Sequence, residues 1–321
     1  MKTVNLKGTN LMVSNISLGT STMGTHVDEK TSEAILDTYL GKGGSFIDTA
    51  NIYGRFSPPG EPAAELLIGK WMKKHHLRDK LILCTKGAAR DYKTLAVRLS
   101  PEVIRSDLEN SLQNLKTDYF DLYYLHKDNP KYTVAEIMET MADLGRQGKF
   151  RYFGLSNWSV ERMREARDYC SAHDLPCFSA NEVMMNMAKI NEDALKDADQ
   201  RFADPQICEF HQETQIPITA YTAAAVGFFE RYGQPDFMDN PKYKRARVMC
   251  LNETNIRRLQ RVRELAALRG LSATDIVLGY LYAQPFQVIP IVGPNSVATL
   301  MENINHSDTT LTPEELNFLL S

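Results

Sequence analysis

FIDTANIYG, residues 46–54, is a short apolar run that stops at an acidic residue, Asp48. Three other stretches are built alike, each an apolar run closed by a polar or ionisable residue: LILCTKG at 81–87, YFDLYYLH at 119–126 and YFGLSNW at 152–158. Short runs rich in β-branched and aromatic residues are typical of strands. Because the carboxyl ends of the strands in a parallel barrel share one rim, we expect the residues that close these runs to meet there.

Runs with strand character recur along the whole chain. We expect eight strands, at 16–20, 45–50, 81–86, 121–126, 152–157, 177–183, 217–222 and 288–293. Helical patterns lie between them, near 30–42, 62–76, 101–116, 133–148, 158–173, 192–199 with 204–214, and 253–269 with 272–284. Each connection is long enough to join two parallel strands. Because no Pro/Gly-rich linker interrupts the alternation, the sequence predicts one (β/α)8 TIM barrel, a single domain over residues 1–321.

The segment ahead of the barrel, TVNLKGTNLMVSN at 3–15, has a Lys-Gly turn between two short alternating runs. This pattern predicts a β-hairpin that caps the bottom of the barrel. A doubly wound nucleotide-binding fold is the alternative architecture. Its phosphate-binding motifs are missing, because no G-x-G-x-x-G follows a predicted strand and no G-x-x-x-x-G-K-[ST] occurs.

The bulk properties are those of an ordinary globular protein. The 321 residues carry a formal charge of −3, with 43% hydrophobic and 24% charged residues, which favours neither a nucleic-acid nor a membrane partner. The amino terminus lacks the apolar segment of a secretory signal, and no run approaches membrane-spanning length. Five cysteines without a CxxC pair indicate reduced thiols. We therefore expect a cytoplasmic protein.

Each polar residue at the predicted rim has a structural interpretation when it is taken alone. Asp48 could bond to nearby backbone in a turn, and Tyr53 could simply pack. His126 could be a core residue or a metal ligand. Lys86 is harder to explain in this way, because a lysine that ends the run LILCT would point toward the barrel mouth.

Together these four side chains suggest a site for proton transfer to a carbonyl. A phenol titrates near pH ~10, so it needs help to exchange a proton at neutral pH. A neighbouring ammonium lowers that pKa, and a carboxylate keeps the ammonium charged and oriented. We therefore expect Asp48 to orient Lys86, Lys86 to tune Tyr53, and His126 to bond the substrate oxygen.

Other uses of these residue types fit less well. One Asp, one His, a Lys and a Tyr make a poor metal-ligand set, and no H-x-H or H-E-x-x-H spacing appears. The sequence also lacks the G-x-S-x-G motif of serine hydrolases, which argues against acyl transfer by a serine. Carbonyl reduction needs a hydride, which side chains do not provide, so a nicotinamide cofactor is implied.

From the first hairpin to about residue 305, the chain resembles the aldo-keto reductase superfamily. The four stretches quoted at the start occur in the order and at the spacing that are typical of that family. The resemblance implies reduction of small aldehydes or ketones with NADP(H) or NAD(H). It also implies a catalytic tetrad with Tyr53 as the general acid, made up of Asp48, Tyr53, Lys86 and His126.

The same resemblance implies the cofactor-binding residues. They are Ser156 and Asn157 in GLSN, Glu182 in SANEVMMN, Tyr221 in ITAYT, Gly227 and Phe228 in the next loop, and Gly293, Ser296, Thr299, Glu302 and Asn303 in IPIVGPNSVATLMENI. Glu182 stands where the family usually has glutamine. An ionised carboxylate can accept a hydrogen bond from the nicotinamide amide but cannot donate one to it.

The choice between NADPH and NADH stays open. The family often carries Lys or Arg for the 2′-phosphate at positions that are here Gly293, Ser296 and Thr299, all uncharged. Charge-assisted bonds supply much of phosphate recognition. The basic stretch KYKRAR at 242–247 is interpreted as a solvated loop, with the alternative that it folds over the cofactor and supplies the missing charge.

Four apolar residues are candidates for the substrate pocket, and core packing is an equal alternative for each: Met23, Phe56, Trp158 and Phe229. Two other functions also remain open. A cofactor-binding sensor or regulatory protein would bind the cofactor with little turnover, and an unrelated barrel isomerase or hydrolase would not bind it.

Overall fold

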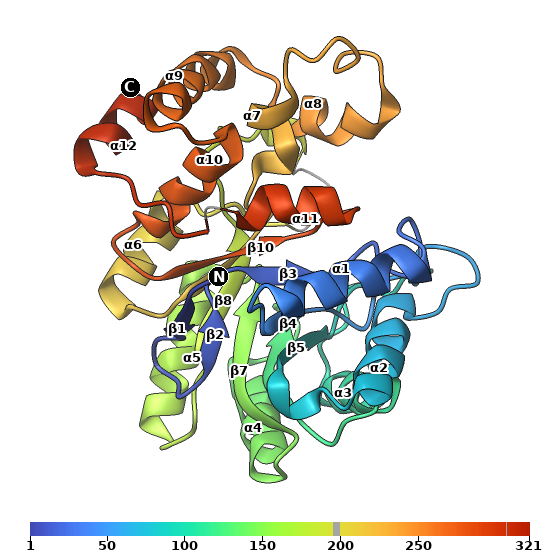
Figure 1. Cartoon of the computed structure of the whole chain (residues 1–321). Helices are drawn as coiled ribbons and strands as arrows, with labels where there is room; N and C mark the ends of the chain where they lie inside the picture. The colour runs from blue at the N-terminus through green and yellow to red at the C-terminus, as the bar shows by residue number, and fades with distance from the viewer. Residues whose placement is uncertain (195–199, 306) are drawn as a thin grey trace.

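A closed barrel of eight parallel strands forms the centre of the computed structural model, which describes residues 1–194, 200–305 and 307–321 (Figure 1). The strands follow one another around the barrel in chain order, and the last pairs with the first. They are β3 (Ser17–Gly19), β4 (Phe46–Asp48), β5 (Ile82–Gly87), β6 (Phe120–Leu125), β7 (Phe150–Ser156), β8 (Ala180–Met184), β9 (Ile218–Tyr221) and β10 (Val288–Val292). All eight predicted strands and the (β/α)8 fold class are confirmed.

The predicted amino-terminal hairpin is also confirmed. β1 (Thr3–Asn5) pairs antiparallel with β2 (Met12–Ser14). Hairpin residues Leu6, Leu11 and Val13 are buried against side chains inside the barrel, which are Phe46, Cys84, Leu122, Tyr124, Ala180 and Ile289. Phe46 and Ala180 begin their strands, so the hairpin closes the amino-terminal end of the barrel and leaves the opposite rim free.

The helices between the strands lie close to their predicted positions. They are α1 (Glu29–Gly41), α2 (Ala63–His75), α3 (Pro101–Leu115), α4 (Val134–Arg146), α5 (Val160–Ala172), α6 (Pro205–Thr214), α9 (Glu253–Arg269) and α10 (Ala273–Tyr282). The start of α3 is the predicted one, because Ser100 accepts a hydrogen bond from Val103 N and Pro101 is the first helical residue. A short 3-10 helix, η1 (Arg78–Lys80), precedes β5.

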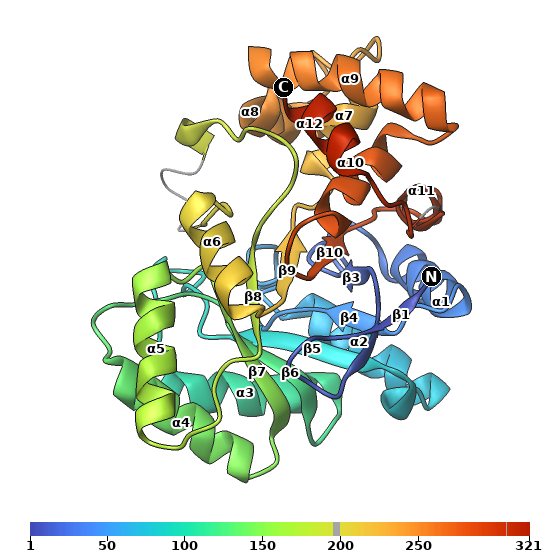
Figure 2. The same ribbon diagram turned by 90° about the vertical axis from the view of Figure 1, so that its left-hand side faces the viewer.

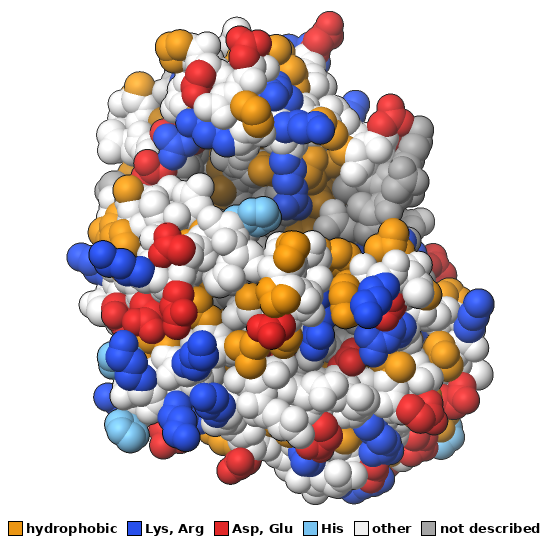
Figure 3. All heavy atoms as spheres, turned by 90° about the vertical axis from the view of Figure 1, so that its right-hand side faces the viewer, with side chains coloured by type: hydrophobic (Ala, Val, Ile, Leu, Met, Phe, Trp, Pro, Cys, Tyr) orange, Lys and Arg blue, Asp and Glu red, His pale blue; other side chains and the backbone are white. Residues whose placement is uncertain are grey.

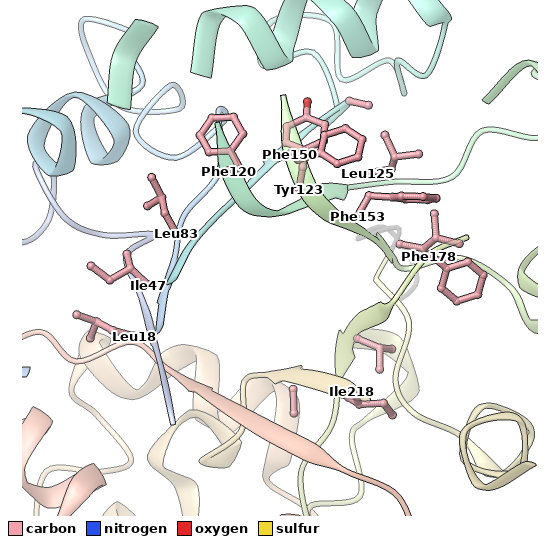
Figure 4. Close-up of a cluster of buried hydrophobic side chains, with 14 of the residues drawn as sticks. Leu18, Ile47, Leu83, Phe120, Tyr123, Leu125, Phe150, Phe153, Phe178 and Ile218 are labelled. Carbon is pink, nitrogen blue, oxygen red and sulfur yellow. The ribbon is translucent and has the colours of Figure 1, made fainter. Parts of the chain in front are cut away.

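Side chains on the outer surface of the barrel pack under these helices. Figure 4 shows Leu18, Ile47 and Leu83 pointing away from the barrel interior, and all three belong to the main hydrophobic cluster. Successive residues of a strand face opposite sides. Residues next to these outward positions therefore point into the barrel.

Several helices were not expected from the sequence. They are η3 (Ala225–Gly227), α7 (Phe228–Arg231), η4 (Pro241–Tyr243), α8 (Lys244–Cys250), α11 (Val297–Ile304) and α12 (Pro313–Leu320). At the predicted helix 192–199 the structure has a 3-10 helix, η2 (Glu192–Ala194), and residues 195–199 lie outside the described part of the chain.

The interpretation of 242–247 as a loop is wrong, since η4 and α8 cover the stretch. Ala246, Met249 and Cys250 are buried at helical spacing and anchor α8, while Lys244 and Arg245 remain exposed. Two of the three anchors lie beyond the basic stretch itself, so its composition alone suggested a loop.

The carboxy-terminal helices form a second hydrophobic cluster beside the barrel. Buried residues of α7, α8, α9, α10 and α12 share this cluster. Figures 1 and 2 show α7, α8, α9 and α12 gathered at one end of the molecule, with α11 between them and α1. Within the described residues, the helices are too short or too polar to cross a membrane.

Candidate active site

Asp48, Lys86 and His126 stand at the carboxyl ends of three neighbouring strands. Asp48 ends β4, Lys86 is next to last in β5, and His126 follows β6. β5 pairs with both β4 and β6, so the three residues share one part of the rim. Each lies two positions after a residue of the barrel interior, namely Phe46, Cys84 and Tyr124. Strand alternation therefore directs all three side chains inward.

Lys86 is the centre of this arrangement. Its side chain is fully buried, and its Nζ lies 2.5 Å from Asp48 Oδ1 and donates to Thr49 O at 3.0 Å. Asp48 is itself only 3% exposed. A buried ammonium persists only with such partners, because burial disfavours the charged form. Burial lowers the pKa of Lys86. Its acidic neighbours, Asp48 first among them, outweigh this effect and raise the pKa well above its usual value.

Tyr53 and His126 lie beside this ion pair. Tyr53 is in the turn after β4, where its N–H donates to Ala50 O. The Tyr53 ring meets the His126 ring edge to face at a centroid distance of 6.1 Å, and Lys86 Nζ is 5.4 Å from the Tyr53 ring centre. The structure thus brings the four predicted tetrad residues together.

Burial dominates the acid–base properties of Tyr53 and His126. It raises the pKa of Tyr53 above the usual value, and Lys86 opposes this change. The expected influence of Lys86 is thus present, but it is the smaller effect. Burial, followed by the charges of Lys86 and Lys127, lowers the pKa of His126 well below 6.5. His126 is therefore neutral at neutral pH.

Glu182 has a contact that the sequence did not suggest. Its Oε1 lies 3.2 Å from Lys86 Nζ, and the side chain is 3% exposed. Burial and then Asp48 raise the pKa of Glu182 to about 8, with Lys86 opposing them. Oε2 is buried and has no hydrogen-bond partner among the described residues. No local signal could have revealed this pair, because β5 and β8 are far apart in sequence.

Ser156 and Asn157 belong to a hydrogen-bonded cluster at the end of β7. Asn157 has a left-handed backbone, with φ of 60°, and its Nδ2 donates to Ser156 Oγ at 2.9 Å. Its Oδ1 accepts from Tyr221 OH at 2.8 Å and from Arg201 N at 3.0 Å. The cluster ties three of the predicted cofactor residues to each other. Arg201 was not predicted.

The basic helix α8 approaches this cluster. Burial, with Glu182 next, raises the pKa of Tyr221, and the charge of Arg245 opposes the change. Arg245 is exposed on α8, and its Nε donates to Met249 Sδ at 3.4 Å. The charge of one residue of the 242–247 stretch thus acts on a predicted cofactor residue.

The predicted loop residues Gly227 and Phe228 differ in their surroundings. Gly227 has a left-handed backbone, with φ of 73°, and precedes α7. Phe228 is fully buried, and its ring packs on those of Phe229, Tyr232 and Phe237. Gly227 is thus partly exposed, whereas the Phe228 side chain belongs to the second cluster.

The carboxy-terminal motif forms the start and the body of α11. Ser296 caps the helix by accepting from Thr299 N at 3.1 Å. Glu302 forms an ion pair with Arg231 of α7, and Asn303 is 9% exposed. Gly293 is exposed in the loop before the helix. Arg231 was missed because it is 71 residues from Glu302 in the chain.

The four candidate substrate residues divide by burial. Met23, Trp158 and Phe229 are at most 2% exposed and belong to the hydrophobic clusters, as in their core-packing interpretation. Phe56 is 64% exposed, in the loop that follows Tyr53. Phe56 is therefore the candidate that remains free to meet a ligand.

One face of the molecule is hollowed between the carboxy-terminal helices and the rest of the barrel (Figure 3). Hydrophobic side chains lie inside the hollow, and Lys or Arg side chains lie along its edges. Across the described residues, no cluster of three or more His, Cys, Asp and Glu side chains could hold a metal ion.

Comparison with known proteins relates this arrangement to oxidoreductases. The chain is 29% identical over 317 residues to an uncharacterised oxidoreductase, YrpG, of Bacillus subtilis (strain 168). The aligned region covers 97% of this chain and 92% of that protein. It is 28% identical to norsolorinic acid reductase B of Aspergillus parasiticus, over 96% of this chain and 80% of that protein. It is 26% identical to aryl-alcohol dehydrogenase [NADP(+)] of Phanerodontia chrysosporium, with 97% and 83% covered. The profile of the Aldo/keto reductase family matches residues 15–319, so the chain belongs to that family.

Proposed function

We propose that this protein is an NAD(P)H-dependent reductase of small aldehydes and ketones, reversible toward alcohol oxidation, with Tyr53 as the general acid. The observation that supports it most is the buried Lys86–Asp48 ion pair, with 2.5 Å between Nζ and Oδ1, beside Tyr53 and a neutral His126. A buried charge pair at a barrel rim is costly to maintain and is typical of sites that move protons.

The four side chains would divide the work between them. Asp48 keeps Lys86 charged and fixed, and Lys86 opposes the effect of burial on the Tyr53 pKa. A lower phenol pKa eases the transfer of the Tyr53 proton to the developing alkoxide. Neutral His126 carries one ring N–H, which would hold the substrate oxygen in reach of Tyr53.

The rim residues suit a nicotinamide cofactor. Asn157 and Ser156 offer amide and hydroxyl groups, Tyr221 offers a ring, and Glu182 Oε2 is a buried oxygen without a partner among the described residues. Gly227 and the amino-terminal turn of α11 would serve the phosphates and adenosine. When bound, the reduced nicotinamide supplies the hydride that the side chains lack.

Two observations bear on the choice between NADPH and NADH. Ser296 and Thr299 are uncharged and Arg231 is already paired with Glu302, but the charge of exposed Arg245 on α8 acts on Tyr221. One relative is named for NADP(+). We propose that the basic residues of α8 supply the charge for a 2′-phosphate, so that NADPH binds more tightly than NADH. Separate fluorescence titrations with the two cofactors test this preference.

The reductase proposal is tested by consumption of NADPH or NADH with a panel of aldehydes that includes aromatic ones. Steady turnover that disappears in Tyr53→Phe is the expected result. A cofactor-binding sensor is the second candidate, and it is favoured by Glu182, which takes up part of the Lys86 ammonium that the reaction needs. Tight cofactor binding with negligible turnover on every aldehyde would favour the sensor.

A further inference from the structure

Lys86 is surrounded by as many acceptors as it has N–H groups. Its Nζ lies 2.5 Å from Asp48 Oδ1, 3.0 Å from Thr49 O and 3.2 Å from Glu182 Oε1. An ammonium has three donors and no acceptor. Tyr53, whose ring centre is 5.4 Å from the same nitrogen, must therefore compete for a donor.

We propose that Glu182 is a positioning residue that competes with Tyr53 for the Lys86 ammonium. The proposal rests on the proposed function, in which Tyr53 is the general acid. Ionised Glu182 attracts the third N–H of Lys86 and so weakens the hydrogen bond through which Lys86 lowers the pKa of Tyr53. Protonated Glu182 accepts more weakly than a carboxylate, so that N–H passes to the Tyr53 oxygen.

The charges around Glu182 make its two protonation states close in energy. The titratable groups that face it come from β4 and the turn after it, from β5, β6 and β9, and are Asp48, Tyr53, Cys84, Lys86, Tyr124 and Tyr221. One ammonium thus faces two buried carboxylates. Burial and Asp48 raise the pKa of Glu182 to about 8, which brings the change of state close to neutral pH.

A signal from Tyr53 near this pH can be assigned to Glu182. Burial lowers the pKa of His126 well below 6.5, and the pKa values of Lys86, Cys84, Tyr124 and Tyr221 are all raised above their ordinary values. These groups therefore titrate away from the range in which Glu182 changes state.

The experiment follows Tyr53 in the cofactor-free protein by NMR of 13Cζ-labelled tyrosine, with Tyr53→Phe to identify its signal. We expect a shift of the Tyr53 signal with a midpoint near the Glu182 pKa of about 8. Glu182→Gln should abolish this step. The matched control is Glu65→Gln, which removes another fully buried carboxylate with a raised pKa that bonds to Thr85 and Asn114 instead.

Glu182→Asp separates competition from the simple effect of a nearby charge. It keeps a carboxylate but is one methylene shorter, so its oxygen no longer reaches Lys86. Competition predicts that the step is lost or much reduced in Glu182→Asp, as in Glu182→Gln. A step that persists unchanged in Glu182→Asp, or in Glu182→Gln, overturns the proposal, as does its loss in Glu65→Gln.

Turnover provides the second readout. If the protein reduces aldehydes, kcat/KM for wild type should fall above about pH 8 while Glu182→Gln stays level through that range. If kcat/KM falls above this pH in wild type and falls equally in Glu182→Gln, the proposal is contradicted. Complete absence of turnover in wild type instead counts against the reductase function, and the Tyr53 signal still tests the competition.

Discussion

Asp48 and Lys86, 38 residues apart in the chain, meet inside the barrel with 2.5 Å between Oδ1 and Nζ. The side chain of Lys86 is fully buried and that of Asp48 is 4% exposed. If one partner is removed, water therefore cannot take its place beside the remaining charge. The pair holds the Lys86 ammonium in place, with its Nζ 5.4 Å from the centre of the Tyr53 ring.

Replacing Tyr53 by phenylalanine should remove carbonyl reduction and leave cofactor binding intact. The phenol oxygen is the only part lost, and the ring can keep its edge-to-face contact with His126 at 6.1 Å. General acid catalysis contributes about 10²–10⁴-fold. Turnover assays beside fluorescence titration of NADPH measure both effects, and near-normal turnover in the variant would refute the role of Tyr53.

Breaking the buried ion pair should destabilise the fold. Asp48→Asn leaves Lys86 with Glu182 as its remaining carboxylate partner, and loss of one member of such a pair costs about 3–5 kcal/mol of unfolding free energy. The control is the surface pair Arg164–Glu213, half exposed, where Glu213→Gln should change stability by about 0–1 kcal/mol. Urea unfolding compares the two, and equal effects would contradict the expectation.

The stability of the protein should depend on pH through Glu182. Its pKa rises from 4.5 to about 8 on folding, so the unfolded chain ionises this group first. The contribution of protonated Glu182 is complete below pH 4.5 and is lost as the pH rises through 8. Each unit of pKa difference is worth about 1.4 kcal/mol.

Urea unfolding of wild type and Glu182→Gln at the two ends of this range measures the difference. Wild type should lose more unfolding free energy than the variant, because all other groups are common to both. Equal losses would mean that Glu182 does not titrate differently in the folded state.

A methyl group at Gly154 should disturb the barrel interior. A Cβ there would lie 2.3 Å from Tyr124 Cε1 and 2.9 Å from Ala180 O, and Tyr124 is held by a 2.8 Å hydrogen bond to Thr219. Overpacking of this kind costs about 1–3 kcal/mol. Gly41, at the end of α1, has open space around its Cβ position, so Gly41→Ala is the matched control. Thermal unfolding should show a lower Tm for Gly154→Ala and an unchanged Tm for Gly41→Ala.

The basic residues of α8 should favour NADPH over NADH. Lys244→Gln and Arg245→Gln remove exposed positive charges of α8, one of which acts on Tyr221, so NADPH affinity should fall while NADH affinity changes little. Lys242→Gln is the control, because Lys242 is already paired with Asp236. Titrations at low and high salt measure the change. Unaltered NADPH affinity in both α8 variants would remove these residues from phosphate recognition.

The local pattern of residues predicted the barrel, and it named four side chains that the structure brings together at one part of the rim. The runs ending at Asp48, Lys86 and His126 became β4, β5 and β6, because short β-branched and aromatic runs between helices suit a parallel sheet that is covered on both faces. Alternation along each strand then turned those side chains inward. The helix α8 was not predicted, because its anchors Met249 and Cys250 lie outside the basic stretch that suggested a loop.

The sequence by itself determined which side chains stand at the rim, since strand ends and residue alternation are local properties. Only the tertiary structure decided how those side chains interact. It placed Glu182 against Lys86 and Arg231 against Glu302, pairs that lie on separate elements. It also buried Tyr53 deeply enough for desolvation to outweigh the influence of Lys86 on its pKa. The physical reason is that charge interactions and burial depend on distances through space, which residues remote in the chain set only when the barrel closes.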